Sequence, residues 1–138
     1  MRNLKYAAVA IFAATVLNSC SEQTPAKLVE GKWKFDNLET ASASAADKEF
    51  LKAVVEEMKK STSCDYNSNG EVVRSTMSIG GDPKVEKGTW KLSEDGKKLT
   101  TVLQGKEEVG DVVELNENKF TVKSKDETGN FTTFYYVK

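Results

Sequence analysis

The sequence predicts a mainly β protein, a small antiparallel barrel of eight strands with one amphipathic helix between the first two strands. Short runs of alternating apolar and polar residues recur along residues 28–138, which is typical of half-buried strands. Clusters of Gly, Asn and Asp separate these runs at hairpin spacing. One segment, residues 45–60, has its apolar residues at helical spacing instead.

The first expected strand covers residues 28–38. Trp33 and Phe35 share one face with Val29, whereas the positions between them carry charged residues. This period of two predicts a strand with one buried face.

The expected helix covers residues 45–60. Ser44, followed three residues later by Asp47, is typical of an N-terminal cap, and Lys59 and Lys60 suit the C-terminal end of the helix dipole. The simplest interpretation is a lid or flank that packs on the sheet. A helix lying on a membrane is the alternative, which the mixed acidic and basic polar face disfavours.

Seven further strands are expected after the helix, at residues 63–66, 71–79, 85–92, 98–103, 107–115, 119–124 and 131–137. Short strands joined by tight turns favour a barrel or a sandwich. Closure removes exposed sheet edges, and eight strands suit a small up-and-down barrel, so we prefer the barrel.

The barrel interior is expected to hold most of the large apolar side chains. An eight-stranded barrel can be just wide enough for side chains alone, so these residues either line a pocket or fill the core, and we favour a mostly filled core. The candidates for lining a ligand pocket are Trp33, Phe35, Tyr66, Met77, Trp90 and Phe120.

Asp111 is a charged residue with an ambiguous orientation. It shares the parity of Val109 and Val113, which would point it inward in a regular strand. A buried carboxylate needs a partner, and Arg74 lies on the wrong parity of its strand if Met77 faces inward. Asp111 is therefore expected near a barrel mouth.

The N-terminal residues are expected to direct the chain out of the cytoplasm. A short basic start precedes an apolar run of 11 residues at 6–16, whereas a membrane-spanning helix needs roughly 20. Residues 1–19 therefore predict a signal peptide. Residues 20–26 form a polar tether, and residues 27–138 form the barrel domain.

The segment Leu17-Asn18-Ser19-Cys20 resembles the lipobox of bacterial lipoproteins. The resemblance implies cleavage after Ser19, acylation of Cys20 by chains such as palmitate, and a lipid anchor in the cell envelope. An Asp directly after the Cys resembles an inner-membrane retention mark, but Ser21 occupies this position. This favours the outer membrane, with the domain on its periplasmic face or at the cell surface. An ordinary cleaved signal with a chance Cys is the alternative.

Composition excludes several classes of function. The chain contains no His, which removes Ser-His-Asp and Cys-His catalysis and His-ligated zinc. Once Cys20 is assigned to lipid, Cys64 stands alone, as a buried small hydrophobe or, alternatively, a reactive thiol. The net charge of −1 gives no basic footprint for nucleic acid. We expect no enzyme activity, cofactor or metal.

Gly31 and Trp33 are similar to the Gly-x-Trp signature that opens the lipocalin barrel, and Gly88 and Trp90 repeat this spacing. With the lipobox, the chain resembles the lipocalin-like lipoproteins of gut-type Gram-negative bacteria, a calycin-like β-barrel family. Lipocalins carry their main helix after the last strand, so a helix after the first strand is more similar to the portal of fatty-acid-binding relatives. The resemblance implies an apolar cavity and a small ligand.

The leading hypothesis is a membrane-anchored lipoprotein that binds a small apolar or amphipathic ligand without catalysis. Its expected partners are the membrane, through Cys20, and possible small hydrophobic ligands, with no nucleic acid. The alternative is a structural or interaction module of an envelope complex, or an inhibitor, that acts through its outer surface. The sequence names no protein partner.

Overall fold

The computed structural model describes residues 23–41, 44–78 and 81–138. The signal peptide at 1–19 and the expected lipidation site, Cys20, lie outside these residues. The elements of the described residues are α1 (Pro25–Val29), β1 (Gly31–Thr40), α2 (Ala45–Ser61), β2 (Ser63–Tyr66), β3 (Glu71–Thr76), β4 (Lys84–Leu92), β5 (Lys98–Leu103), β6 (Lys106–Leu115), β7 (Lys119–Lys125) and β8 (Phe131–Val137).

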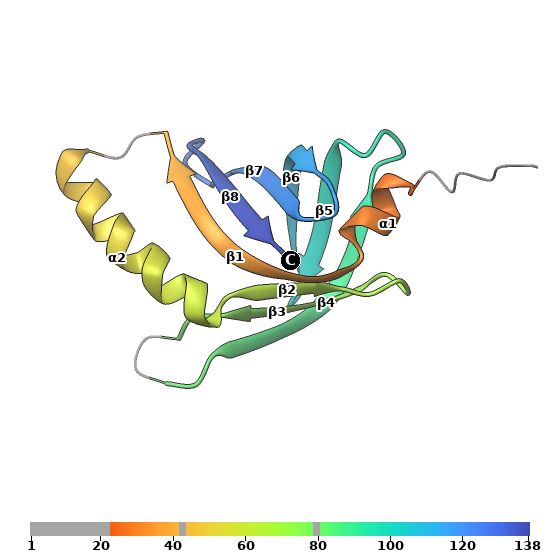
Figure 1. The fold of residues 1–138 in the computed structure, drawn as a ribbon, viewed down its shortest axis with the longest axis horizontal. Helices are drawn as coiled ribbons and strands as arrows, with labels where there is room; N and C mark the ends of the chain where they lie inside the picture. Colours follow the sequence, from red (N-terminus) through yellow and green to blue (C-terminus); the bar gives the residue numbers. More distant parts are fainter. Residues whose placement is uncertain (1–22, 42–43, 79–80) are drawn as a thin grey trace, which may run out of the picture.

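The eight strands of the described residues form one closed antiparallel barrel. Each strand pairs with the next along the chain, and β8 returns to pair with β1, as the curved sheet in Figure 1 shows. This confirms the predicted barrel over the sandwich, and it confirms the helix between the first two strands.

Most strand bounds lie within two residues of the predicted ones, and two bounds differ more. The first strand begins at Gly31 instead of residue 28, because Pro25–Val29 form the short helix α1, with Pro at a first helical position that suits its fixed φ. The end of the expected tether therefore lies in α1. β3 ends at Thr76 instead of residue 79, so Met77 follows the strand.

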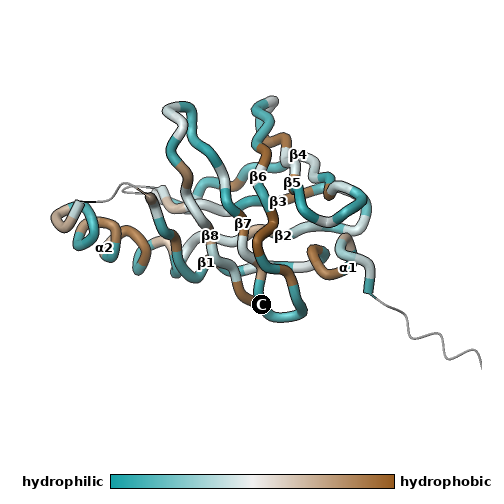
Figure 2. Tube along the Cα trace, turned by 90° about the horizontal axis from the view of Figure 1, so that it is seen from above, coloured by the Kyte–Doolittle hydropathy of each residue, from teal (hydrophilic) through white to brown (hydrophobic). Residues whose placement is uncertain are grey.

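The helix α2 has the predicted start and the predicted cap. Ser44 Oγ accepts a hydrogen bond from the backbone N–H of Asp47 at 3.3 Å, and the Asp47 carboxylate accepts one from the Ser44 N–H at 3.0 Å. Figure 2 shows hydrophobic and hydrophilic residues alternating around α2. Val55 is buried whereas Phe50 is 71% exposed, so α2 flanks the barrel with one side. The helices of the described part of the chain are too short or too polar to cross a bilayer.

A β-bulge in β6 decides which of its side chains face the interior. The register shifts between Val112 and Glu114, so Gly110 and Val112 face inward before the bulge and Leu115 faces inward after it. A bulge adds one residue to one strand and inverts the alternation beyond it.

The inward orientation considered for Asp111 is therefore wrong. Asp111 lies before the bulge on the outward parity, and its carboxylate accepts a hydrogen bond from Lys98 Nζ at 2.7 Å on the exposed surface. The assumption of a regular strand failed because Leu115 lies beyond the bulge, whereas Val109 and Val113, which share its parity, are exposed.

The two ends of the barrel differ, and α1 and α2 lie on opposite sides of it (Figure 1). We call the end beside α1 the closed end. There Trp33 and Phe120 are fully buried with ring centroids 5.3 Å apart, and Tyr66 packs edge-on against both Phe120 and Trp90. Four aromatic rings thus fill the interior, and burial of each contributes a few kcal/mol.

The helix α1 seals the closed end. Trp33 Nε1 donates a hydrogen bond to the Val29 carbonyl at 2.7 Å, and Val29 itself is fully buried. Lys138 Nζ donates to the carbonyls of Leu28 and Glu30 and lies 4.4 Å from the centroid of the Trp33 ring. Both ends of the described chain therefore meet over the same tryptophan.

Candidate functional site

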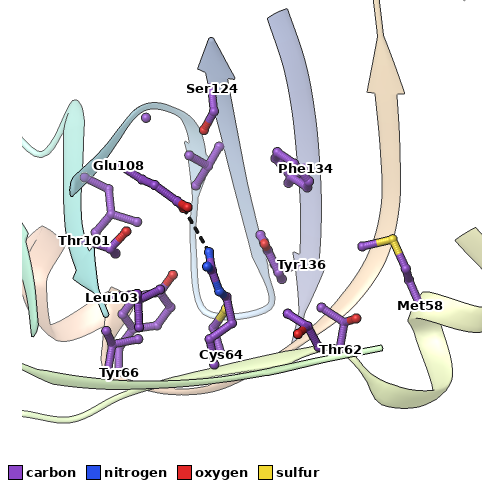
Figure 3. Close-up of a pocket in the computed structure, with 16 residues that line it drawn as sticks. Met58, Thr62, Cys64, Tyr66, Thr101, Leu103, Glu108, Ser124, Phe134 and Tyr136 are labelled. Carbon is purple, nitrogen blue, oxygen red and sulfur yellow. Dashed lines mark hydrogen bonds and ion pairs between the residues drawn. The ribbon is translucent and has the colours of Figure 1, made fainter. Parts of the chain in front are cut away.

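The opposite end of the barrel, beside α2, holds a cavity of about 150 Å³. We call this end the mouth. Side chains from α2 and from strands β2, β3 and β5 to β8 line the cavity, as Figure 3 shows. Its volume is close to that of an engineered protein cavity that takes up benzene, and it is about half the roughly 300 Å³ at which pockets for drug-sized ligands begin.

The floor of the cavity is apolar. Leu99, Leu103 and Val122 line it and are each less than a tenth exposed. Gly110 lines it as well, and a Cβ there would collide with the side chain of Val122. The missing side chain of Gly110 is thus one reason why the barrel fits together at this level.

A network of charged side chains crosses the mouth. Arg74 Nη1 donates to Glu108 Oε2 at 2.9 Å, a contact marked by the dashed line in Figure 3. Arg74 Nε and Nη2 both donate to Glu86 Oε2, at 3.2 and 3.0 Å. Lys84 Nζ lies 2.9 Å from the other Glu86 oxygen. Arg74 is thus held between two carboxylates.

These contacts keep the network charged. Burial disfavours the Arg74 cation, but the hydrogen bonds and charges of Glu108 and Glu86 outweigh burial and raise the pKa of Arg74 above its ordinary value. Hydrogen bonds from Lys84 and then Arg74 lower the pKa of Glu86. The mouth therefore carries fixed charges at neutral pH.

Three neutral polar groups lie deeper in the cavity. Burial raises the pKa of the Cys64 thiol, an effect that hydrogen bonds with the hydroxyls of Tyr66 and Tyr136 partly oppose. Burial likewise raises the pKa of both tyrosines. Cys64 is thus protonated at neutral pH, which agrees with a buried small residue and disfavours the alternative of a reactive thiol.

Thr62 provides an unpartnered polar atom at the cavity. Its Oγ1 is buried and has no hydrogen-bond partner among the described residues, and its side chain lines the cavity beside the end of α2. An unpaired buried hydroxyl costs about 1–3 kcal/mol, so a native structure usually supplies a water or a ligand at such a point.

The structure brings only one of the six pocket candidates to this cavity, namely Tyr66. Trp33, Trp90 and Phe120 pack at the closed end. Phe35 is buried against Tyr136 on the neighbouring strand, with ring centroids 6.2 Å apart. Met77 follows the end of β3 and does not line the cavity.

Sequence reasoning missed the charged residues of the mouth. Arg74 would face outward if β3 continued to an inward-facing Met77, but β3 ends at Thr76 and Arg74 lines the cavity. Arg74 shares the parity of Val72, which is fully buried, and both line the cavity. The sequence does place Arg74 on the face of the apolar Val72. Val72, Arg74 and Thr76 are each two residues apart, so they share one face of β3, which ends before Met77.

The cavity offers hydrogen-bond donors and acceptors above an apolar floor, which suits binding of a molecule with one polar and one apolar part. Within residues 23–41, 44–78 and 81–138, no three side chains of the metal-ligating types gather in one place.

A family model described as a lipocalin-like domain matches residues 29–122. A lipocalin-like protein from Bacteroides uniformis has a similar structure, with 13% identity, a TM-score of 0.55, and coverage of 80% of this chain and 98% of that one. An uncharacterized protein from Bacteroides eggerthii has 14% identity, a TM-score of 0.53, and coverage of 79% and 98%.

A redesigned β barrel is also similar, with 12% identity, a TM-score of 0.54, and coverage of 85% of this chain and 96% of that one. No match was found among curated proteins. At these identities the solved structures support the fold alone.

Proposed function

The chain belongs to the lipocalin-like domain family, and from that premise we propose that it binds a small amphipathic molecule, without catalysis, in the cavity at the mouth. The observation that carries the proposal is the composition of the cavity wall. Buried leucine and valine side chains form the floor, and charged, hydroxyl and thiol groups line much of the remaining wall. A wall with both kinds of group suits a molecule that has one polar and one apolar part.

The volume limits what the cavity can hold. About 150 Å³ accommodates a molecule of the size of benzene, or one end of a longer molecule whose remainder leaves through the mouth. Thr62 supports occupation, because its buried Oγ1 would gain the partner that the described residues do not supply.

A blocking variant tests this proposal. Thr76 lies half-buried on the inward parity of β3 and lines the cavity, so Thr76→Trp should fill the mouth. Thr89→Trp, on the exposed face of β4, is the matched control. We expect NMR titration with benzyl alcohol and benzoate to show binding to the wild type and to the control, and its loss in Thr76→Trp. Equal binding by both variants would exclude this cavity.

We further propose that Cys20 carries a lipid and holds the domain at the outer membrane. The lipobox resemblance of residues 17–20 supports this proposal. Because α1 follows the anchor after a few residues and seals the closed end, the mouth opens away from the membrane. Cys20→Ser should release the protein from membranes and abolish palmitate labelling. Unchanged partitioning and labelling would exclude the anchor.

The small cavity also favours a second candidate, an interaction module that acts through its outer surface. Phe50 is 71% exposed on α2 and offers an apolar contact for a partner. Crosslinking in intact cells with a photoreactive residue at position 50 should then yield one stoichiometric protein adduct, and a control at Lys52 should yield the same adduct weakly. The absence of any adduct would leave ligand binding as the sole proposal.

A further inference from the structure

The ion pair between Arg74 and Glu108 joins two strands that are not neighbours in the barrel. Arg74 lies on β3 and Glu108 on β6, yet Nη1 and Oε2 are 2.9 Å apart. The pair therefore spans the cavity, which both residues line. A molecule bound in the cavity therefore lies close to these two groups.

The two carboxylates on Arg74 are held differently. The Glu86 side chain is 10% exposed, accepts two hydrogen bonds from Arg74, and is also paired with Lys84. The Glu108 side chain is 43% exposed, and among the described residues its ion pair with Arg74 is the only one. Glu108 can therefore turn into solvent at far smaller cost than Glu86.

The charges of the network favour one further anion at this position. Without Glu108, two cations, Arg74 and Lys84, face one carboxylate, Glu86, which leaves one positive charge. Arg74, whose side chain is 25% exposed, would then share a single carboxylate with Lys84. Glu108 supplies the missing negative charge in the empty cavity, and a ligand could supply it instead.

We propose that the ligand is a small carboxylate whose carboxylate group replaces Glu108 on Arg74 Nη1. This inference rests on the proposed binding function and assigns the chemical class of its ligand. Exchange of one carboxylate for another keeps the charge balance and the charge-assisted hydrogen bond. The displaced Glu108 regains full hydration outside the mouth.

The remainder of such a ligand matches the rest of the cavity. An apolar part of about the size of a benzene ring fits the 150 Å³ above Leu99, Leu103 and Val122. The buried Oγ1 of Thr62 is available as a further hydrogen-bonding group in the same cavity. A cationic ligand would instead bring a third positive charge beside Arg74 and Lys84.

Glu108 is then an internal competitor of the ligand, which gives a sharp test. Benzoate, benzyl alcohol and benzylamine share one ring and differ in the charge of the attached group. We expect the full-length wild type to bind benzoate at least about tenfold more tightly than benzyl alcohol, because the benzoate contact is between charged groups. Benzylamine should bind most weakly.

The variant Glu108→Gln removes the competitor. Benzoate affinity should rise about tenfold, while affinity for benzyl alcohol changes less than about twofold. Glu107→Gln is the matched control, since Glu107 is the exposed neighbour on the outward face of the same strand and the change removes the same charge. It should leave benzoate affinity within about twofold of the wild type.

Three results would overturn the carboxylate assignment: equal affinity for benzoate and benzyl alcohol, preference for benzylamine, or no gain from Glu108→Gln beyond that from Glu107→Gln. In the first two cases binding itself persists and the proposed function stands. If none of the three probes binds to the wild type or to Glu108→Gln, both the proposed function and its ligand class fail. Circular dichroism of each variant confirms that the barrel is intact.

Discussion

At the closed end of the barrel, four aromatic rings and α1 fill the interior, whereas at the mouth apolar, small and charged side chains surround a cavity. The same eight strands build both ends. Trp33 and Trp90, the tryptophans of the two Gly-x-Trp repeats, both pack at the closed end. The residues that resemble the family signature thus pack in the core, while the charged groups of the proposed binding site lie at the other end.

The largest effect is expected at the closed end. Trp33→Ala should lower the free energy of unfolding by about 3–5 kcal/mol, because the ring is fully buried and its Nε1 holds the Val29 carbonyl of α1. Urea unfolding followed by circular dichroism measures the change. Phe50→Ala, at an exposed ring on α2, serves as the control and should change stability by less than about 0.5 kcal/mol.

A loss below about 1 kcal/mol in Trp33→Ala would mean that the closed end is not the stabilising core. The closed end and the mouth would then not differ in their contribution to stability.

The second largest loss of stability is expected at Gly88, the glycine of the second Gly-x-Trp motif. A Cβ on Gly88 would collide with the backbone carbonyl oxygen of Val102 on β5, so Gly88→Ala must push two strands apart. We expect a loss of about 2–3 kcal/mol. Gly81→Ala has room for the added methyl group and should be nearly neutral in the same urea assay. Equal stability of both variants would contradict the close approach of β4 and β5.

At the mouth, a smaller effect is expected from Arg74. Arg74→Met should cost about 2 kcal/mol, because Glu86 keeps Lys84 but loses two hydrogen bonds in a nearly buried position. The double variant Arg74→Met with Glu86→Gln should recover part of this loss, since it removes the nearly buried carboxylate that lost two hydrogen bonds. Thermal unfolding of the wild type, Arg74→Met and the double variant measures these differences in stability. A double variant less stable than Arg74→Met would show that Glu86 has another role.

The smallest effect is a dependence of stability on pH. The pKa of Glu86 in the folded protein lies below its ordinary value of 4.5, so its contribution is present above that pH and is lost as the pH falls through the folded pKa. Glu86→Gln should therefore lose less stability than the wild type between about pH 5 and pH 2.5. Glu117→Gln, on an exposed turn, is the control. Parallel profiles for the wild type and Glu86→Gln would contradict the ion pair.

The fold was predictable because most strands have one buried face. Alternation fixed β2, β5 and β8 to the residue, and the cap at Ser44 fixed the start of α2. The five residues of α1 are too few to show a helical period, so they were expected to be tether and strand. The bulge in β6 left no trace in composition, because it is defined only by pairing with β7.

The candidate site was far less predictable, for a physical reason. Large aromatic residues were sought as pocket lining, but large rings fill space and so mark the packed end of the barrel. A cavity forms where small side chains face inward, here Gly110, Ser124 and Thr101. Small residues also occur in turns and on surfaces, so their presence in a sequence does not reveal a void. Tyr66 lies between the two ends. It packs against Phe120 and also lines the cavity, so it is the one large aromatic candidate that the structure places there.

The most direct test of the contrast between the ends is an NMR titration of the wild type with benzoate, read at the backbone amides and at the indole N–H groups of Trp33 and Trp90. Both indoles donate to backbone carbonyls at the closed end, at 2.7 and 2.9 Å. We predict saturable shifts at Cys64, Arg74 and Glu108, with both indole signals unmoved. Shifts concentrated on the indoles, with the mouth unaffected, would contradict binding at the mouth.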